Sequence, residues 1–252
     1  MGPTEDPWLR CYQRVDDPSL RLVCLPHAGG SASAFRNWPQ LLAPAIEMHA
    51  VRYPGREDRL GEPCLTELTE LADQVTAAVL RLPAGPLALF GHSMGASVAH
   101  EATVRLERAG RPVSMLFVSG RAAPHRLRPT RLGAGGSDED LLAEVRRLDP
   151  RSGPLLTMPG IEQLVLPAIR GDYRLLSSYS AHQPTTVRAP IVGYAGTDDP
   201  EVPVAEVASW REVSSTSFEL RTFDGSHFFL AAAEAETEVV ADLGSRLTGL
   251  AG

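Results

Sequence analysis

The stretch Gly91-His-Ser-Met-Gly95 decides the fold of this chain. It follows the apolar run Pro86-Leu-Ala-Leu-Phe90, which predicts a buried strand, and a helical pattern begins near Ala96. A tight turn between a strand and a helix leaves little room for side chains at its flanks, and glycine at both ends relieves that crowding. Ser93 would then lie at the tip of the turn with its hydroxyl exposed, beside a helix N-terminus that favours developing negative charge. The pentapeptide therefore predicts a nucleophilic serine.

Apolar runs and helical patterns alternate on both sides of this turn. Strands are expected at 20–25, 46–51, 86–90, 114–119, 190–195 and 217–222, with a weaker one at 9–13, and helices at 34–43, 66–81, 96–109, 203–212 and 231–247. Such alternation predicts a mostly parallel central sheet flanked by helices on both faces. Together with the serine turn it indicates the α/β-hydrolase fold, as a single domain over residues 1–252.

The interval 122–183 breaks this alternation, because it carries no strand pattern and yet lies between two core strands. Ser137 with Asp140 forms a capping signal for a helix that reaches Leu148, and a second helical pattern runs from Leu164 to Tyr179. We expect an inserted helical lid over the active site. The alternative is a helical excursion that only packs on the core.

Two further strand ends offer the partners that a serine nucleophile needs, in the chain order Ser, Asp, His of this fold. A loop with Asp198 and Asp199 follows the strand expected at 190–195, and a loop with His227 follows the last strand. An imidazole removes the hydroxyl proton, and a carboxylate fixes its tautomer and stabilises its charged form. His227 is the predicted base. Asp199 is favoured as the acid over its neighbour Asp198, which is expected to cap the loop backbone.

The Gly-rich loop Pro26-His-Ala-Gly-Gly-Ser31 follows the early strand. In this fold, that loop and the residue after the nucleophile each give one backbone N–H to the oxyanion, which predicts Ala28 and Met94 as the donors of the oxyanion hole. The loop contains neither G-x-G-x-x-G nor G-K-[ST], so we do not expect it to bind phosphate. His27 is not expected to be catalytic, because one base suffices and His227 is better placed.

Composition excludes several classes of function. The 252-residue chain has a formal net charge of −7, which argues against general affinity for nucleic acid. No apolar stretch is long enough for a membrane span, and the acidic N-terminus lacks the apolar segment of a secretory signal. The three cysteines and seven histidines show no metal-ligand spacing. We therefore expect a cytoplasmic, monomeric protein without structural disulfides, metal or cofactor.

All 24 basic residues are arginines, and four of them lie close together after the strand expected at 114–119: Arg121, Arg126, Arg128 and Arg131. A run of charge is usually only a solvated face. Here it follows the C-terminal end of a central strand, which is the edge where ligands of α/β proteins bind. We therefore expect these arginines to help an acidic protein partner to dock.

The motifs together resemble those of type II thioesterases, the stand-alone editing enzymes of polyketide and non-ribosomal peptide assembly lines. The resemblance extends from about Leu22 to Leu230 and rests on an ordered series: Pro26-His-Ala-Gly-Gly, Tyr53-Pro-Gly-Arg-Glu57, Gly91-His-Ser-Met-Gly95, Leu166-Pro-Ala-Ile-Arg170 with Asp172-Tyr173, Asp199-Pro and Gly225-Ser-His-Phe-Phe229. It implies hydrolysis of acyl groups from the phosphopantetheine arm of acyl or peptidyl carrier proteins, through an acyl-enzyme and without a cofactor. It also implies that Ser93, Asp199 and His227 form the catalytic triad.

The chain departs from this family at two places. Ser226 stands where family members often have glycine, and Leu148–Pro154 replaces a Gly-Gly-Thr-Pro-like turn of the lid, which leaves acyl selectivity open. Three other functions use the same fold. A small-molecule carboxylesterase would have the same triad, and a chain-releasing thioesterase would cyclise its product, although no carrier-domain remnant precedes the motifs. A non-catalytic binding protein would be expected to have lost a triad member.

Overall fold

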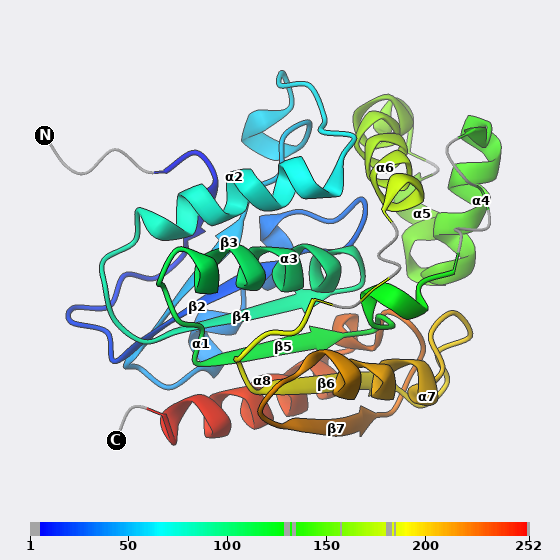
Figure 1. The fold of residues 1–252 in the computed structure, drawn as a ribbon. Coiled ribbons are helices and arrows are strands. Elements are labelled where there is room, and N and C mark those ends of the chain that lie inside the picture. Colours follow the sequence, from blue (N-terminus) through cyan, green and yellow to red (C-terminus); the bar gives the residue numbers. More distant parts are fainter. Residues whose placement is uncertain are drawn as a thin grey trace, which may run out of the picture.

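The computed structural model describes residues 6–128, 132, 135–156, 158–179, 183 and 185–250. A sheet of seven strands runs through the centre in the order β1-β3-β2-β4-β5-β6-β7 (Figure 1). Its strands are β1 (Leu9–Cys11), β2 (Leu20–Leu25), β3 (Ile46–Val51), β4 (Leu87–His92), β5 (Met115–Ser119), β6 (Ile191–Gly196) and β7 (Phe218–Phe223). Only β1 pairs antiparallel, at one edge, and the remaining pairs are parallel. The predicted mostly parallel sheet is confirmed.

Helices cover both faces of the sheet, as the alternating pattern predicts. They are α1 (Trp38–Leu41), α2 (Leu68–Leu80), α3 (Met94–Arg108), α7 (Val204–Val207) and α8 (Ala233–Thr248). Apolar residues of α2 and α3 pack with one face of the sheet, and those of α1 and α8 pack with the other. The central strand β4 is buried along its whole length. The turn with Ser93 that follows it therefore starts from a rigid part of the core.

Two of the expected helices are shorter than the pattern predicts. The segment at 34–43 forms a 3₁₀ turn, Ala32–Phe35, followed by the single turn of α1. The segment at 203–212 is α7 followed by a 3₁₀ turn, Ala208–Val213. In the second case the hydroxyl of Ser209 donates to the carbonyl of Glu206, which offers the backbone an alternative to the regular helical ladder.

In the described part of the interval between β5 and β6 lie three α-helices: α4 (Asp138–Leu148), α5 (Gly153–Leu156) and α6 (Ile161–Ser178). We call them the lid helices. Figure 1 shows them together beyond the ends of β4 and β5, away from the layers that cover the sheet. The predicted capping box begins α4, since Ser137 Oγ accepts from the N–H of Asp140 and the Asp140 carboxylate accepts from the N–H of Ser137. Within the described residues, no helix is long and apolar enough to cross a membrane.

Candidate active site

The turn after β4 has the strained geometry that its glycines predict. Ser93 adopts φ 53° and ψ −117°, in the left-handed half of the map, and such a conformation in a non-glycine residue costs about 1–3 kcal/mol. A Cβ atom on Gly91 would lie 2.1 Å from the carbonyl oxygen of Gly95, and one on Gly95 would lie 2.1 Å from the carbonyl oxygen of Leu25. Helix α3 begins at Met94, two residues earlier than the pattern predicts, so the helix N-terminus directly follows the serine.

The structure brings Ser93, His227 and Asp199 into one hydrogen-bonded series. His227 Nε2 lies 3.0 Å from Ser93 Oγ, and His227 Nδ1 lies 2.8 Å from Asp199 Oδ2. The aspartate follows β6, the histidine follows β7, and both side chains are buried. A base that contacts the hydroxyl on one side and a buried carboxylate on the other has the geometry of an activated serine nucleophile.

The two adjacent aspartates have different environments. The second oxygen of Asp199, Oδ1, accepts from the backbone N–H groups of Glu201 at 2.8 Å and Val202 at 3.0 Å, which fixes the carboxylate. Asp198 is exposed, and its side chain contacts only Thr197 Oγ1, at 3.5 Å, among the described residues. The expectation that Asp198 caps the loop backbone is wrong. Asp199 does so, because Oδ1, the oxygen that does not contact His227, accepts from the residues that follow it in the same loop.

Two other histidines surround the site. The ring centroid of His92 lies 5.4 Å from that of His227 and 5.9 Å from that of His27. Burial lowers the pKa of His27 to about 4, and burial with the nearby charge of His227 lowers the pKa of His92 well below its usual range. Both rings are therefore neutral near pH 7. A positive charge formed on His227 meets no like charge on either neighbour.

The loop at 27–31 presents the first predicted oxyanion donor. Gly30 N–H donates to the carbonyl of His27 at 3.0 Å, and Gly29 N–H donates to Asp172 Oδ2 at 2.7 Å. Among the described residues, the N–H of Ala28 has no acceptor. Met94 N–H, the second predicted donor, is the first of helix α3 and has no acceptor within that helix. Both groups are available to a ligand.

A cavity of about 560 Å³ opens at Ser93 and His227. The lid helices give most of its apolar lining: Val145, Leu148, Leu156, Val165, Ile169, Tyr173 and Leu176. Ala28 and Val202 complete the wall near the loops. Charged side chains, among them Arg121, Glu144 and Glu201, also line the cavity. A cavity of this size with an apolar wall on the lid side fits a small acyl group held against a reactive centre.

The expected arginine cluster is divided in the structure. Arg121 lies in the cavity wall, where its Nε donates to Ser97 Oγ at 3.1 Å, and burial lowers its pKa to about 10. Arg126 and Arg128 are exposed at the cavity rim, and each pairs with a carboxylate, Glu212 at 3.2 Å and Glu206 at 2.6 Å. Arg131 lies outside the described residues. Arg121, Arg126 and Arg128 therefore do not form one uncompensated basic surface.

Sequence reasoning gave no role to a buried ion pair beside the site. Arg56 makes a two-pronged contact with Asp172, Nη1 to Oδ2 and Nη2 to Oδ1, each 2.8 Å. Both residues are buried. Burial alone would lower the pKa of Arg56, but the Asp172 carboxylate and other nearby groups raise it above its usual value. The sequence did contain one sign of this ion pair. Asp172 adjoins Ile169 and Tyr173 on the apolar face of a predicted helix, and a charge there requires a partner.

Polar residues also come together far from the serine. Cys11, Glu47 and His49 have ligand atoms within 4.8 Å of one another at the β1–β3 edge. Glu47 already pairs with His49 at 2.9 Å and with Arg21 at 3.4 Å, so a cation there would meet a guanidinium. Among the described residues, Cys11, Cys24 and Cys64 form no disulfide.

Comparison with known proteins gives the family. A family model described as "Thioesterase domain" matches residues 20–247. The chain is 44% identical to "Thioesterase PikA5" of Streptomyces venezuelae over 88% of this chain and 80% of that protein. It is 40% identical to "Probable cadicidin biosynthesis thioesterase" of Streptomyces griseus, of which it spans 62%.

A solved structure agrees with this assignment. The type II thioesterase BorB from the borrelidin biosynthetic cluster superposes with a TM-score of 0.89 and 39% identity, over 98% of this chain and all of that chain. YbtT, a type II thioesterase from the yersiniabactin pathway, superposes with a TM-score of 0.81 and 30% identity. The strand–serine–helix turn, the parallel sheet and these matches lead to one conclusion: the chain belongs to the thioesterase family of α/β-hydrolases.

Proposed function

We propose that this protein is a type II thioesterase that hydrolyses acyl groups from the phosphopantetheine arm of acyl or peptidyl carrier proteins, and so clears stalled or aberrant groups from an assembly line. The observation that carries the proposal is the series Ser93–His227–Asp199 beside a cavity whose lid side is apolar. Relatives named as thioesterases support the substrate class, among them one of cadicidin biosynthesis and one from the borrelidin biosynthetic cluster.

The mechanism follows from the positions of these groups. His227 Nε2, at 3.0 Å from Ser93 Oγ, takes the hydroxyl proton as the oxygen attacks the thioester carbonyl. The carbonyl oxygen becomes an oxyanion, which the N–H groups of Ala28 and Met94 stabilise. The carbon–sulfur bond then breaks, and the thiol leaves with the proton from His227. Asp199 holds the imidazolium throughout.

The second half of the reaction uses the same groups on water. His227 removes a proton from a water molecule as its oxygen attacks the acyl–Ser93 ester. A second oxyanion forms at the same N–H donors and collapses, which releases the carboxylic acid and returns the proton from His227 to Ser93 Oγ. A thioester has less resonance stabilisation than an ester, so the triad and the two N–H groups suffice for the acylation step.

The lid helices define the acyl chamber in this proposal. The interval 122–183 is an insertion in a single domain, and its apolar side chains line the cavity above Ser93. The chamber takes the acyl group while the arm enters from the rim. The lining favours an apolar acyl chain over a strongly polar one, because burial of apolar surface stabilises the complex by about 25 cal/mol per Å².

The test uses carrier proteins loaded with different acyl groups. Intact-mass spectra are taken before and after addition of the enzyme or its Ser93→Ala variant. The proposal expects loss of the acyl mass with the phosphopantetheine arm retained, and no loss with the variant. Hydrolysis of small esters without any hydrolysis of loaded carriers would identify a carboxylesterase. A cyclised product would identify a chain-releasing enzyme, and no turnover of either substrate would leave a binding protein.

A further inference from the structure

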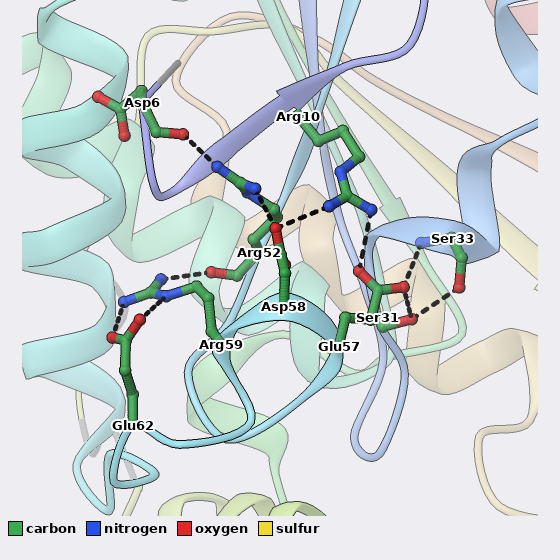
Figure 2. Close-up of polar contacts among 9 residues, drawn as sticks. All are labelled: Asp6, Arg10, Ser31, Ser33, Arg52, Glu57, Asp58, Arg59 and Glu62. Carbon is green, nitrogen blue, oxygen red and sulfur yellow. Dashed lines mark hydrogen bonds and ion pairs between the residues drawn. The ribbon is translucent and has the colours of Figure 1, made fainter. Parts of the chain in front are cut away.

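Two consecutive residues, Arg56 and Glu57, contact the loop at 27–31, which we call the oxyanion loop, from its buried side and its exposed side. Glu57 adopts φ 49°, which is uncommon for a residue with a side chain and marks a position that its surroundings enforce. Figure 2 shows the outer side, where Glu57 Oε1 accepts from Ser31 Oγ at 2.7 Å and from the N–H of Ser33 at 3.3 Å. Arg10 Nη1, at 3.5 Å, holds the other carboxylate oxygen.

Arg56 reaches the same loop from the buried side. Its Nη1 donates to the carbonyl of Gly30 at 2.9 Å, and its guanidinium fork holds both oxygens of Asp172. Asp172 in turn accepts the N–H of Gly29 at 2.7 Å. The loop is therefore fixed at three successive residues, through an N–H at Gly29, a carbonyl at Gly30 and a hydroxyl at Ser31.

This arrangement determines which N–H group is left for a ligand. The N–H groups of Gly29 and Gly30 are both taken by acceptors of the protein itself, Asp172 and His27. The bond to Asp172 holds the peptide plane between Ala28 and Gly29, which is the plane that follows the Ala28 N–H. With this plane and the Gly30 carbonyl both held, the backbone of Ala28 has less freedom to turn. Without that acceptor, the Gly29 N–H would lose its partner within the protein and the plane would be free to turn.

The acceptor comes from a lid helix and not from the sheet. Asp172 lies on α6, between Ile169 and Tyr173, which both line the acyl cavity. Ile169 also touches the loop, since a Cβ atom on Gly29 would lie 3.0 Å from its Cγ1. The position of α6 over the cavity and the orientation of the oxyanion loop are therefore fixed by the same turn of helix.

We propose that Asp172 and Arg56 are positioning residues, which hold the oxyanion loop so that the N–H of Ala28 faces the reacting carbonyl and which couple that loop to lid helix α6. The inference rests on the proposed function only in taking Ala28 as an oxyanion donor. A misplaced donor weakens transition-state stabilisation more than substrate binding, because the negative charge develops only in the transition state. The pair therefore acts on kcat more than on KM.

The test compares Asp172→Asn and Arg56→Lys with wild type on a short acyl-N-acetylcysteamine thioester. Asp172→Asn keeps an acceptor oxygen but loses the charge that orients the fork, and we expect kcat to fall about 10²-fold with KM changed less than about threefold. Affinity for a trifluoromethyl ketone analogue, whose adduct with Ser93 carries an oxyanion, should fall by the same factor. Affinity for the product acid should not change.

Arg170→Gln is the matched control, because Arg170 lies on the same helix and contacts Gly136 and Asp138 of the lid region. It should keep wild-type kcat and analogue affinity. An equal loss in this control would show that lid stability, and not the loop, limits the rate, and would overturn the proposal. So would an Asp172→Asn protein with a lowered unfolding temperature and wild-type kcat.

If Asp172→Asn does not fold, Arg56→Lys tests whether the pair positions the oxyanion loop. Lysine keeps a positive charge beside Asp172 but cannot bridge both carboxylate oxygens and the Gly30 carbonyl at once. Wild-type kcat in a folded Arg56→Lys protein would overturn the proposal. Failure of the proposed function gives a different result. Thioester turnover would then survive Ser93→Ala, and the Arg56 and Asp172 variants would keep wild-type kcat.

Discussion

Two regions meet at Ser93, and they are held in different ways. On the sheet side, Ser93, Asp199 and His227 follow strands whose main-chain pairing fixes each loop, β4 with β5 and β6 with β7. On the lid side, α6 reaches the oxyanion loop through the side chains of Ile169 and Asp172. Main-chain pairing survives most substitutions, whereas a contact made by one side chain is lost with that side chain.

The difference suggests how the two regions divide the work. The residues that transfer protons follow strands of the sheet, of which β4 and β6 are buried along their whole length. The residues that line the acyl cavity depend on three lid helices with a small core of their own, Leu141, Ile169 and Tyr173. We therefore expect substitutions on the sheet side to abolish the reaction, and substitutions on the lid side to change its rate or its choice of acyl group.

The largest effect is expected at the nucleophile. Ser93→Ala removes the only oxygen that His227 Nε2 contacts among the described residues. Turnover should fall by about 10⁶-fold, as in other serine hydrolases that lose the nucleophile. A fluorophosphonate probe should label the wild-type protein at Ser93 and leave the variant unlabelled in the same mass-spectrometric measurement. Measurable turnover by the variant would show that the sheet side does not carry the chemistry.

The next effect separates the two adjacent aspartates. Asp199→Asn cannot hold His227 in the required tautomer, and kcat should fall up to about 10⁴-fold. Asp198→Asn is the control, because its side chain is exposed and does not contact His227. Stopped-flow or steady-state hydrolysis of one soluble thioester measures both. The reverse ranking would assign the acid to Asp198 and contradict the geometry of the β6 loop.

Most strand positions on the sheet side could be predicted from the sequence. The strands expected at 20–25 and 46–51 have the observed bounds, because an apolar residue begins and ends each run. Strand β4 runs two residues farther than expected, to His92, because Gly91 and His92 pair with Val118 and Ser119 of β5. Such an extension depends on a neighbouring strand, which a local pattern cannot reveal.

On the lid side, the sequence predicted the helices but not the contacts that their side chains make. The capping box at Ser137 predicts the start of α4, and helical spacing predicts most of α6. The contact between Arg56 and Asp172 joins residues that are 116 positions apart, and neither position carries a pattern that names its partner. The separation of Arg121 from the exposed arginines was missed for the same reason, since the sequence shows charge but not the direction of a side chain.

A smaller effect concerns stability where the two regions join, at His27 of the oxyanion loop. Its pKa is about 4 in the folded protein and 6.5 in an ordinary environment, so the unfolded chain binds more protons between these values. Stability should therefore fall as pH is lowered through this window, and His27 should account for about 2 kcal/mol between pH 7 and pH 5. Urea unfolding at both pH values measures it. His27→Gln should reduce the difference by that amount; an unchanged difference would show that His27 titrates normally.

The smallest effect is expected at the cavity rim, where Arg126 and Arg128 remain the candidates for carrier docking. Each already pairs with a glutamate, Glu212 or Glu206, so an acidic carrier has to compete with an existing partner. Arg126→Gln with Arg128→Gln should therefore raise KM for a loaded carrier only about threefold and weaken its salt dependence. KM for an acyl-N-acetylcysteamine should not change. Equal losses on both substrates would assign these arginines to the cavity wall, and no loss on either would place the docking surface on another part of the molecule.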